Sequence, residues 1–282
     1  MKEFKTIKIE ERNDGISIIT LNRPERLNAL NFEMMEELYD YITLLENNFK
    51  IRVVILTGEG RAFSAGLDLK DSRVVIMKKV PEEFQRFKHL LAKDKTKRMI
   101  IGQKIMTDIL IKLRKIPQPI IAAVKGAAHG AAFGLALASD IRIAGESAYF
   151  CNAFIKIGVS GADCGSSYWL PRLIGYSKAA EIIYTGRNVE AKEADRIGLV
   201  SKVVPDSKII EESIKMAKEI FNKSPMGIRF TKDALNMNID APSFESAIKL
   251  ENRTQTLLLN TNDAMEGMFS FLERRDPKYD EW

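Results

Sequence analysis

The chain has 282 residues, of which 45% are hydrophobic and 29% are charged, so it is long enough for one large globular domain with or without a smaller appendage. No window approaches eighteen uncharged apolar residues, and the start lacks the apolar core of a signal peptide. The two cysteines and two histidines offer neither a disulfide framework nor a metal-ligand cluster. We therefore expect a cytoplasmic protein without a metal. The formal net charge is +5, but 38 acidic residues are interspersed with the basic ones and no basic run occurs, so we expect a solvated surface and no nucleic-acid partner.

Strand and helix signals alternate through the first two thirds of the chain. The run ISIITL at 16–21 is short and β-branched, and residues 31–46 follow with Asn31 as an N-cap and apolar residues at helical spacing. The lysine-rich segment 70–99 has weak periodicity and is predicted to be a mobile flap. Further strands are predicted at 52–58, 119–126, 140–145 and 199–204, and a helix at 100–115. This alternation predicts an α/β fold with a largely parallel sheet.

Beyond residue 204 only helix signals remain. The predicted helices cover 207–222, 225–237, 243–260 and 261–274. The change predicts a boundary that divides the chain into a core at 1–204 and a helical region at 205–282. Because four helices with apolar faces have little sheet left to cover, we expect this region to pack against another subunit.

The first loop with candidate chemistry, RAFSAGLDLK at 61–70, directly follows the strand at 52–58. Its small residues, Ala62, Ser64, Ala65 and Gly66, would let a ligand approach the backbone closely and bond to N–H and C=O groups. A tight connection between a strand and a helix would need the same small residues, and this loop alone does not separate the two interpretations.

The second loop, GAAHGAAFGLALASD at 126–140, follows the strand at 119–126. Its glycines and alanines let a helix begin almost in contact with a neighbouring group. A helix start presents free N–H groups and a partial positive charge, which can stabilise a developing oxyanion. Close packing of a helix on a sheet is the alternative explanation for so many small residues.

Several segments carry a family resemblance in their order and separation: NRPERLNAL at 22–30, AFSAGLDLK at 62–70, LALASDIRIA at 135–144 and GRNVEAKEADRIGLVSKVV at 186–204. Together with the glycine/alanine loop they closely resemble the enoyl-CoA hydratase/isomerase, or crotonase, superfamily over nearly the whole chain. The resemblance implies a crotonase (ClpP-like) spiral of ββα units with a C-terminal helical trimerisation region. It also implies an acyl-CoA substrate, no cofactor beyond the coenzyme A of that substrate, and a homotrimer or a hexamer made as a dimer of trimers.

In that family two backbone N–H groups hold the thioester carbonyl and stabilise an enolate. The resemblance places them at Leu67, between the glycine and aspartate of the first loop, and at Ala131, directly after Gly130. Family members carry a glycine run where this chain reads Gly130-Ala131-Ala132. An alanine keeps the donor if its φ is negative, and would be strained if the site needs a positive φ.

The resemblance also implies a binding surface for coenzyme A. The adenine would lie along the backbone of Ser64, Ala65, Gly66 and Leu67. Asp68 and Gly130, in the same two loops, complete this predicted substrate-binding set, although Asp68 also suits a role in fixing the end of its loop.

Two arginines match basic positions of the family. Arg26, in PERLN, matches a residue that contacts a phosphate, and Arg274, in FLERR, matches one that reaches the ligand of a neighbouring subunit. A solvated surface charge is the alternative for each.

The acid/base residues are where this chain departs from the family. The standard hydratase has two catalytic glutamates, and Gly134 and Phe154 stand at those positions here. Neither side chain can move a proton, so water addition by two glutamates is not expected, and Phe154 is predicted to line an acyl or aromatic pocket.

One carboxylate remains. Asp163 falls where dienoyl-CoA isomerases carry a catalytic aspartate and where a chlorobenzoyl-CoA dehalogenase carries its nucleophile. Thr107 replaces the histidine that the dehalogenase needs, so dehalogenation is not expected. We predict proton transfer by Asp163 at the α or γ carbon, with a structural cap of the turn at 164–166 as the alternative. His129 and His89 are weaker candidates for ligand contact.

The leading hypothesis is thus a hydratase/isomerase-type enzyme that acts on acyl-CoA thioesters through Leu67, Ala131 and Asp163. A catalytically weak acyl-CoA-binding protein is the alternative from another class. An acyl-CoA hydrolase or a dienoyl-CoA isomerase that uses Asp163 is a further alternative. RNA binding, which some family members show, lacks support from any basic stripe studded with aromatic residues.

Overall fold

Six strands form the main sheet of the computed structural model, which describes residues 3–70 and 94–279. Their order is β1-β2-β3-β4-β6-β9; β1 is antiparallel to β2, and the other neighbouring pairs are parallel. The strands are β1 Ile7–Glu11, β2 Ile16–Leu21, β3 Val53–Gly58, β4 Ile120–Val124, β6 Ile141–Gly145 and β9 Lys202–Val204. The predicted α/β fold with a largely parallel sheet is confirmed.

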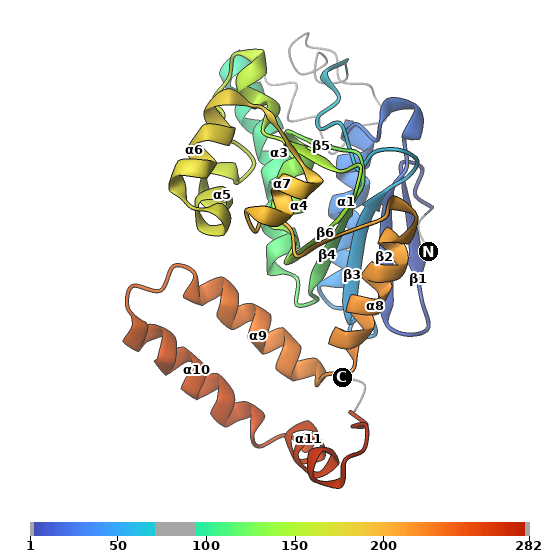
Figure 1. Cartoon of the computed structure of the whole chain (residues 1–282), viewed down its shortest axis with the longest axis vertical. Coiled ribbons are helices and arrows are strands. Elements are labelled where there is room, and N and C mark those ends of the chain that lie inside the picture. Colours follow the sequence, from blue (N-terminus) through green and yellow to red (C-terminus); the bar gives the residue numbers. More distant parts are fainter. Residues whose placement is uncertain (1–2, 71–93, 280–282) are drawn as a thin grey trace.

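A second sheet lies beside the first, in the order β5-β7-β8, with β5 Ala127–His129, β7 Tyr149–Cys151 and β8 Asn188–Glu190. Two successive stretches of chain share one plan: β4, β5 and α4 (Ala131–Ala138), then β6, β7 and α5 (Ser166–Ile174). Each stretch gives one strand to the main sheet, the next strand to the second sheet, and then a helix. The chain therefore winds as a spiral of ββα units, as the family resemblance implied (Figure 1).

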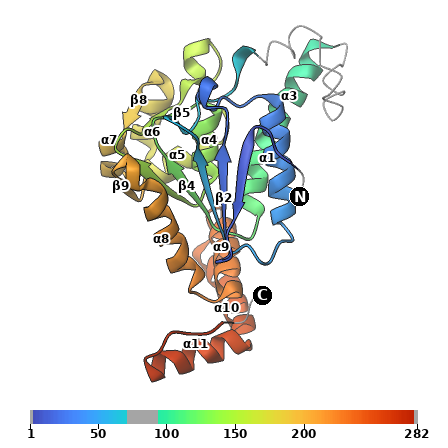
Figure 2. The same cartoon turned by 90° about the vertical axis from the view of Figure 1, so that its right-hand side faces the viewer.

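The main sheet is buried on both faces. Val54 and Leu56 of β3 belong to the core that includes α1 (Phe32–Leu45) and α3 (Lys95–Lys115), whereas Val53 and Ile55 belong to the core under α8 (Ile209–Phe221). Successive side chains of a strand point to opposite faces, so a strand covered on both sides is apolar throughout. Figure 2 shows α1 and α8 on opposite sides of the sheet.

The helix α1 forms where its sequence pattern predicted it. The side chain of Asn31 caps the helix by accepting a hydrogen bond from the Met34 amide at 3.0 Å. The predicted apolar positions are buried against the main sheet: Met34, Met35, Leu38, Tyr41, Ile42 and Leu45.

The helix α3 begins at Lys95, earlier than the predicted start at 100, because the Asp94 side chain caps it by accepting a hydrogen bond from the Lys97 amide at 2.8 Å. Most of the predicted flap at 70–99 falls on residues 71–93, which lie outside the described residues.

Helices alone follow β9 in the described part of the chain: α8, α9 (Pro225–Asn238), α10 (Phe244–Leu258) and α11 (Asn262–Glu273). The four helices predicted here are confirmed. Through Ile209 and Ala217, α8 packs on the main sheet, whereas α9, α10 and α11 extend away from the core (Figure 1). The division at residue 205 stays a prediction; the packing groups α8 with the sheet.

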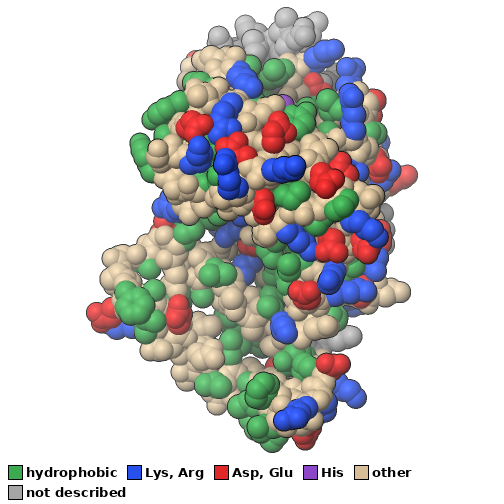
Figure 3. Space-filling view, viewed as in Figure 1, with side chains coloured by type: hydrophobic (Ala, Val, Ile, Leu, Met, Phe, Trp, Pro, Cys, Tyr) green, Lys and Arg blue, Asp and Glu red, His purple; other side chains and the backbone are tan. Residues whose placement is uncertain are grey.

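The remaining helices, α6 (Tyr176–Thr185) and α7 (Ala191–Arg196), flank β8. On the face in Figure 3, basic and acidic side chains intermingle over the core, and apolar side chains gather over the C-terminal helices. None of the described helices is both long and apolar enough to cross a membrane.

Candidate active site

The first loop is held on two sides by backbone pairing. On one side Leu30 donates to the Gly66 carbonyl at 2.8 Å and accepts from the Asp68 amide at 2.9 Å; on the other, Ser64 donates to the Ala127 carbonyl at 2.8 Å. In such a parallel bridge the residue between the two bonded groups turns its own N–H away from the partner. The Leu67 amide therefore points away from Leu30.

Gly66 brings the two loops into direct contact. Its φ is +89°, and a Cβ atom at this position would lie 2.5 Å from the carbonyl oxygen of His129. No L side chain fits there without moving backbone, so glycine is required both by the dihedral angle and by the close approach. The amide of Gly66 donates to the Ser64 hydroxyl at 3.1 Å, which tightens the loop.

The second loop ends in the N-terminus of α4. Gly130 has φ +52° and ψ −117°, a conformation that glycine adopts readily and other residues rarely adopt. Its amide donates to the Cys151 carbonyl at 2.9 Å. Ala131 is the first residue of the helix, and its φ is not positive. The alanine in place of a glycine therefore causes no backbone strain at this position.

Four predicted site residues line one cavity of about 170 Å³: Leu67, Ala131, Phe154 and Asp163. The rest of its described lining is mostly apolar and comes from α1, α3 and the start of α5: Phe32, Met35, Met99, Gly102, Gln103, Met106 and Cys164. Asp163 is the one carboxylate among these lining residues. The cavity is thus an apolar pocket with few polar groups, as small-molecule sites usually are.

Two backbone donors of this pocket are unused. Neither the Leu67 amide nor the Ala131 amide donates a hydrogen bond to another described residue. The reason at Ala131 is that the first amides of a helix have no carbonyl one turn earlier. Ala131 is buried, where an N–H without a partner is unfavourable, whereas Leu67 is 39% exposed. Both amides are available to an acceptor that enters the pocket.

Asp163 is held by one of its two oxygens. Its Oδ1 accepts from Gln103 Nε2 and from the Cys164 amide at 2.6 Å, whereas Oδ2 has no hydrogen-bond partner among the described residues. Its backbone carbonyl also accepts from the Ser166 amide at 2.9 Å. Asp163 therefore stabilises the turn into α5, and it also lines the pocket. The position thus suits the predicted structural cap of the turn, and proton transfer by Asp163 stays a prediction.

Cys164 occupies the space that a side chain at position 134 would need. It adopts φ +49°, and its Cβ would lie 2.7 Å from a Cβ atom at Gly134. Burial, with a smaller contribution from Asp163, raises the pKa of the Cys164 thiol. The thiol stays protonated near neutral pH, in agreement with a packing role.

Seven of the predicted binding residues are not among the described residues that line this pocket: Arg26, Ser64, Ala65, Gly66, Asp68, Gly130 and Arg274. Arg26 is exposed in the short 3-10 helix Pro24–Arg26, and Arg274 is exposed at the end of α11, away from the core. Asp68 pairs with Arg23 at 3.0 Å, and Arg23 also donates to the Ala29 carbonyl at 2.6 Å. Asp68 thus fixes its loop, as one of the two sequence interpretations expected.

His129 is not among the described residues that line the pocket, and its ring packs edge-to-face against Tyr149, with ring centroids 5.1 Å apart. Burial, assisted by Lys156, lowers the pKa of the His129 imidazole. His89 lies outside the described residues. Within residues 3–70 and 94–279, no group of three or more His, Cys, Asp or Glu side chains is placed to hold a metal ion.

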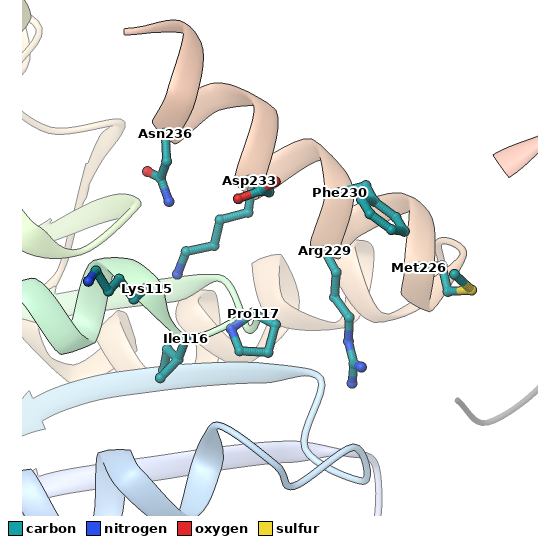
Figure 4. A pocket seen from close by; sticks show the side chains of 9 residues that line it. Lys115, Ile116, Pro117, Met226, Arg229, Phe230, Asp233 and Asn236 are labelled. Atoms are coloured by element: carbon teal, nitrogen blue, oxygen red, sulfur yellow. The ribbon is translucent and has the colours of Figure 1, made fainter. Parts of the chain in front are cut away.

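A larger hollow of about 410 Å³ lies between α9 and the end of α3, and it contains none of the predicted site residues (Figure 4). Its lining includes Lys232, which is 6% exposed and donates to the Gln118 carbonyl at 2.7 Å. Lys232 also pairs with Asp140 at 2.9 Å. The donors of this buried ammonium are used within the chain. The hollow therefore belongs to the packing contact between α9 and the core.

Gln103 is the pocket residue with a hydrogen-bonding side chain that sequence reasoning missed. Its position on α3 fits no motif, and its contact with Asp163 joins residues 60 positions apart. The helical periodicity of α3 was the one available signal, since it places positions 99, 102, 103 and 106 on one face.

Comparisons with known proteins identify the family of this chain. A family model described as enoyl-CoA hydratase/isomerase matches residues 11–282. A Mycobacterium tuberculosis protein named "Probable enoyl-CoA hydratase" is 38% identical over 274 residues, which cover 97% of this chain and 92% of that protein. The 1,2-epoxyphenylacetyl-CoA isomerase of Escherichia coli is 33% identical over 282 residues, with 99% of each chain covered.

Solved structures give the same result. The crystal structure of enoyl-CoA hydratase from Bacillus anthracis superposes with a TM-score of 0.87 at 32% sequence identity, covering 99% of this chain and 100% of that one. Similarity of sequence and of fold thus extends over nearly the whole chain. The chain belongs to the enoyl-CoA hydratase/isomerase family, and it is an enzyme of the hydratase/isomerase type.

Proposed function

We propose that this enzyme isomerises an unsaturated acyl-CoA thioester by moving a double bond through an enolate, with Asp163 as the acid/base group. The supporting observation is that one apolar pocket collects two unpaired amides, from Leu67 and Ala131, and a single described carboxylate. An isomerase among the relatives, the 1,2-epoxyphenylacetyl-CoA isomerase, fits this proposal.

The two amides form the oxyanion hole in this proposal. The thioester oxygen accepts hydrogen bonds from Leu67 and Ala131, and both bonds strengthen as the oxygen gains negative charge in the enolate. The start of α4 adds its partial positive charge. Loss of one such donor typically costs about 3 kcal/mol of transition-state stabilisation.

Asp163 then moves one proton within the substrate. Its Oδ2 takes a proton from the α carbon of a β,γ-unsaturated thioester, and the C–H electron pair becomes the C=C bond of the enolate. The same oxygen returns the proton to the γ carbon, which leaves the double bond between the α and β carbons. Nothing is oxidised or reduced, and no water is consumed, so a single carboxylate suffices.

Water addition needs more than this pocket offers. It requires a water molecule held and activated beside the double bond, which two carboxylates would do. In this chain Cys164 fills the space next to Gly134, and Phe154 presents an aromatic ring near Gly130. These two features favour isomerisation over hydration.

Coenzyme A binding extends this proposal beyond the pocket. The adenine lies along the backbone of residues 64–67, and Arg26, which is exposed, contacts a phosphate. Arg274 lies at the end of α11, which extends away from the core, so it is too far from the pocket of its own chain to bind a ligand there (Figure 1). In this proposal it reaches the ligand of a neighbouring subunit. The active assembly is therefore a homotrimer or a hexamer, and no cofactor is needed beyond the coenzyme A of the substrate.

Turnover of two CoA esters tests the proposal. With trans-3-hexenoyl-CoA we expect the double bond to move into conjugation with the thioester, seen as a rise in ultraviolet absorbance, and to do so faster than crotonyl-CoA gains water. Asp163→Asn should lower this turnover at least about a hundredfold.

The matched control is Asp108→Asn, which removes a carboxylate of α3 that is paired with Lys104 at 2.6 Å and lies outside the pocket. It should retain wild-type turnover. Unchanged turnover in Asp163→Asn would remove Asp163 from the mechanism, and faster hydration than isomerisation would contradict the proposed reaction.

A further inference from the structure

A glutamine from a distant helix contacts the proposed acid/base group. Gln103 Nε2 donates to Asp163 Oδ1, and both residues line the pocket that contains Leu67 and Ala131. The other donor to Oδ1, the Cys164 amide at 2.6 Å, belongs to the residue next to Asp163 in the chain. Gln103 is therefore the one described donor that holds this carboxylate from outside its own loop.

We propose that Gln103 is a positioning residue that fixes Asp163 with Oδ1 bonded and Oδ2 free to face the substrate. The inference rests on the proposed function, since it assigns a role to a residue that acts through Asp163. It explains how the proposed mechanism, which uses a single acid/base group, keeps that carboxylate in a reactive geometry.

The physical reason is the rotation of the carboxylate. With Oδ1 bonded both to the Cys164 amide and to Gln103, the plane of the carboxylate is fixed from two directions. Without Gln103 the remaining donor follows Asp163 along the chain and leaves the side chain free to turn. A displacement of about 1 Å at a catalytic group can cost a hundredfold in rate, so orientation of Oδ2 decides turnover.

Gln103 suits this role chemically as well. Its amide donates to a carboxylate but carries no charge, so it orients Asp163 without pairing with it as a lysine or an arginine would. The side chain is exposed, and among the described residues its amide nitrogen donates only to Asp163, so this contact is what orders it. Ordering a long exposed side chain costs entropy, which the bond to a charged partner offsets.

Two variants separate positioning from a structural tether. Gln103→Met keeps the length of the side chain but has no donor, and Gln103→Glu replaces the donor with a second carboxylate beside Asp163. With trans-3-hexenoyl-CoA we expect kcat to fall about tenfold in Gln103→Met and further in Gln103→Glu. KM should change less than about twofold, because the thioester and coenzyme A contacts remain.

The control is Lys104→Met, which alters the next residue of α3, a lysine paired with Asp108 and 68% exposed. It should leave kcat unchanged. A Gln103→Met enzyme with wild-type kcat would overturn the inference, and so would a loss that appears in KM alone, because a tether between α3 and the 163 loop could produce that without orienting Asp163.

A double variant distinguishes this inference from the proposed function. If Gln103 acts through Asp163, Gln103→Met should have no further effect on kcat in an Asp163→Asn background. Additive losses in the double variant would contradict positioning. If instead Asp163→Asn alone keeps full turnover, the proposed function fails; if Asp163→Asn is inactive and Gln103→Met is normal, only the role of Gln103 fails.

Discussion

Single residues decide the chemistry that this pocket can hold. A Cβ atom at Gly134 would lie 2.7 Å from the Cys164 Cβ and 2.9 Å from the Cys164 carbonyl oxygen, so no larger side chain fits at 134 unless the 163–165 turn moves. Cys164 itself adopts a positive φ that L residues seldom take. This unusual conformation places the Cβ and the carbonyl oxygen of Cys164 beside Gly134, and Asp163 is the carboxylate among the described residues of the pocket.

Gly66→Ala tests the contact between the two loops at the same scale. The new methyl group would overlap the His129 carbonyl, and the φ of +89° would add strain. Because relief requires the loops to separate, the proposed oxyanion hole of the Leu67 and Ala131 amides should be disrupted, and kcat/KM should fall at least about tenfold. Steady-state kinetics of the isomerisation measures this directly.

The control for that substitution is Gly198→Ala. Gly198 has a similar φ of +77°, but the nearest atom to its Cβ position is the Leu173 carbonyl oxygen at 3.9 Å. It should be less stable by about 1 kcal/mol while it retains turnover. Equal kinetic losses in the two variants would show that backbone strain, rather than contact between the loops, is responsible.

At the level of elements, the sequence predicted those whose signals are local. Asn31 and the apolar period after it predict α1, and the continuous apolar run of β3 predicts a strand buried on both faces. The strands β5, β7 and β8 were missed because three residues carry no measurable period. The start of α3 was missed because lysines hide its apolar face, and the role of Gln103 was missed because it depends on a contact with residue 163.

A buried lysine is one of the links between α9 and the core. Lys232 reaches from α9 to the Gln118 carbonyl and to Asp140, which also bonds Arg114 and the Ile120 amide. Burial lowers the pKa of the Lys232 ammonium, and Asp140 opposes that shift. The bonds of the ammonium offset part of the cost of its desolvation.

We therefore expect Lys232→Met to lower the free energy of unfolding by about 3 kcal/mol, because Asp140 and the carbonyl groups of Leu113 and Gln118 each lose a donor. Urea denaturation measures this. Lys249→Met is the control, since Lys249 is 70% exposed and pairs only with Glu245 in α10; it should change stability by less than about 0.5 kcal/mol. Similar losses in both variants would contradict the assigned role of Lys232.

At the level of the whole molecule, the site exists only because the spiral brings distant segments together. Leu30 and Leu67 are bridged, Ser64 and Ala128 are bridged, and Gln103 reaches Asp163. The family resemblance assigned Leu67, Ala131 and Asp163 from short motifs, and the structure places all three at one cavity. Residue patterns alone could not have done so, because the two loops are about 60 residues apart and neither determines where the other lies.

The C-terminal helices leave large apolar side chains in contact with solvent. Phe271, Leu272 and Phe244 are 83%, 74% and 81% exposed, and several more apolar residues of α9, α10 and α11 are also exposed (Figure 3). Surface of this kind usually lies in an interface. Sedimentation of the wild-type protein should give a mass that is a multiple of three chains.

Replacing Phe271 and Leu272 by glutamate should shift the protein toward smaller species, because each buried apolar side chain contributes about 2 kcal/mol to association. Leu44→Glu, at an exposed apolar residue of α1, should leave the assembly intact. A wild-type protein that is monomeric at micromolar concentration would contradict the proposed trimer or hexamer.

The most direct test of the account is the position of a thioester oxygen in the pocket. A crystal structure of the Asp163→Asn variant with trans-3-hexenoyl-CoA should place that oxygen about 2.7–3.1 Å from both the Leu67 and the Ala131 amide nitrogens, with the α carbon beside residue 163. A thioester oxygen bound by neither amide, or an acyl chain that lies outside the cavity formed by Leu67, Ala131 and Asp163, would contradict it.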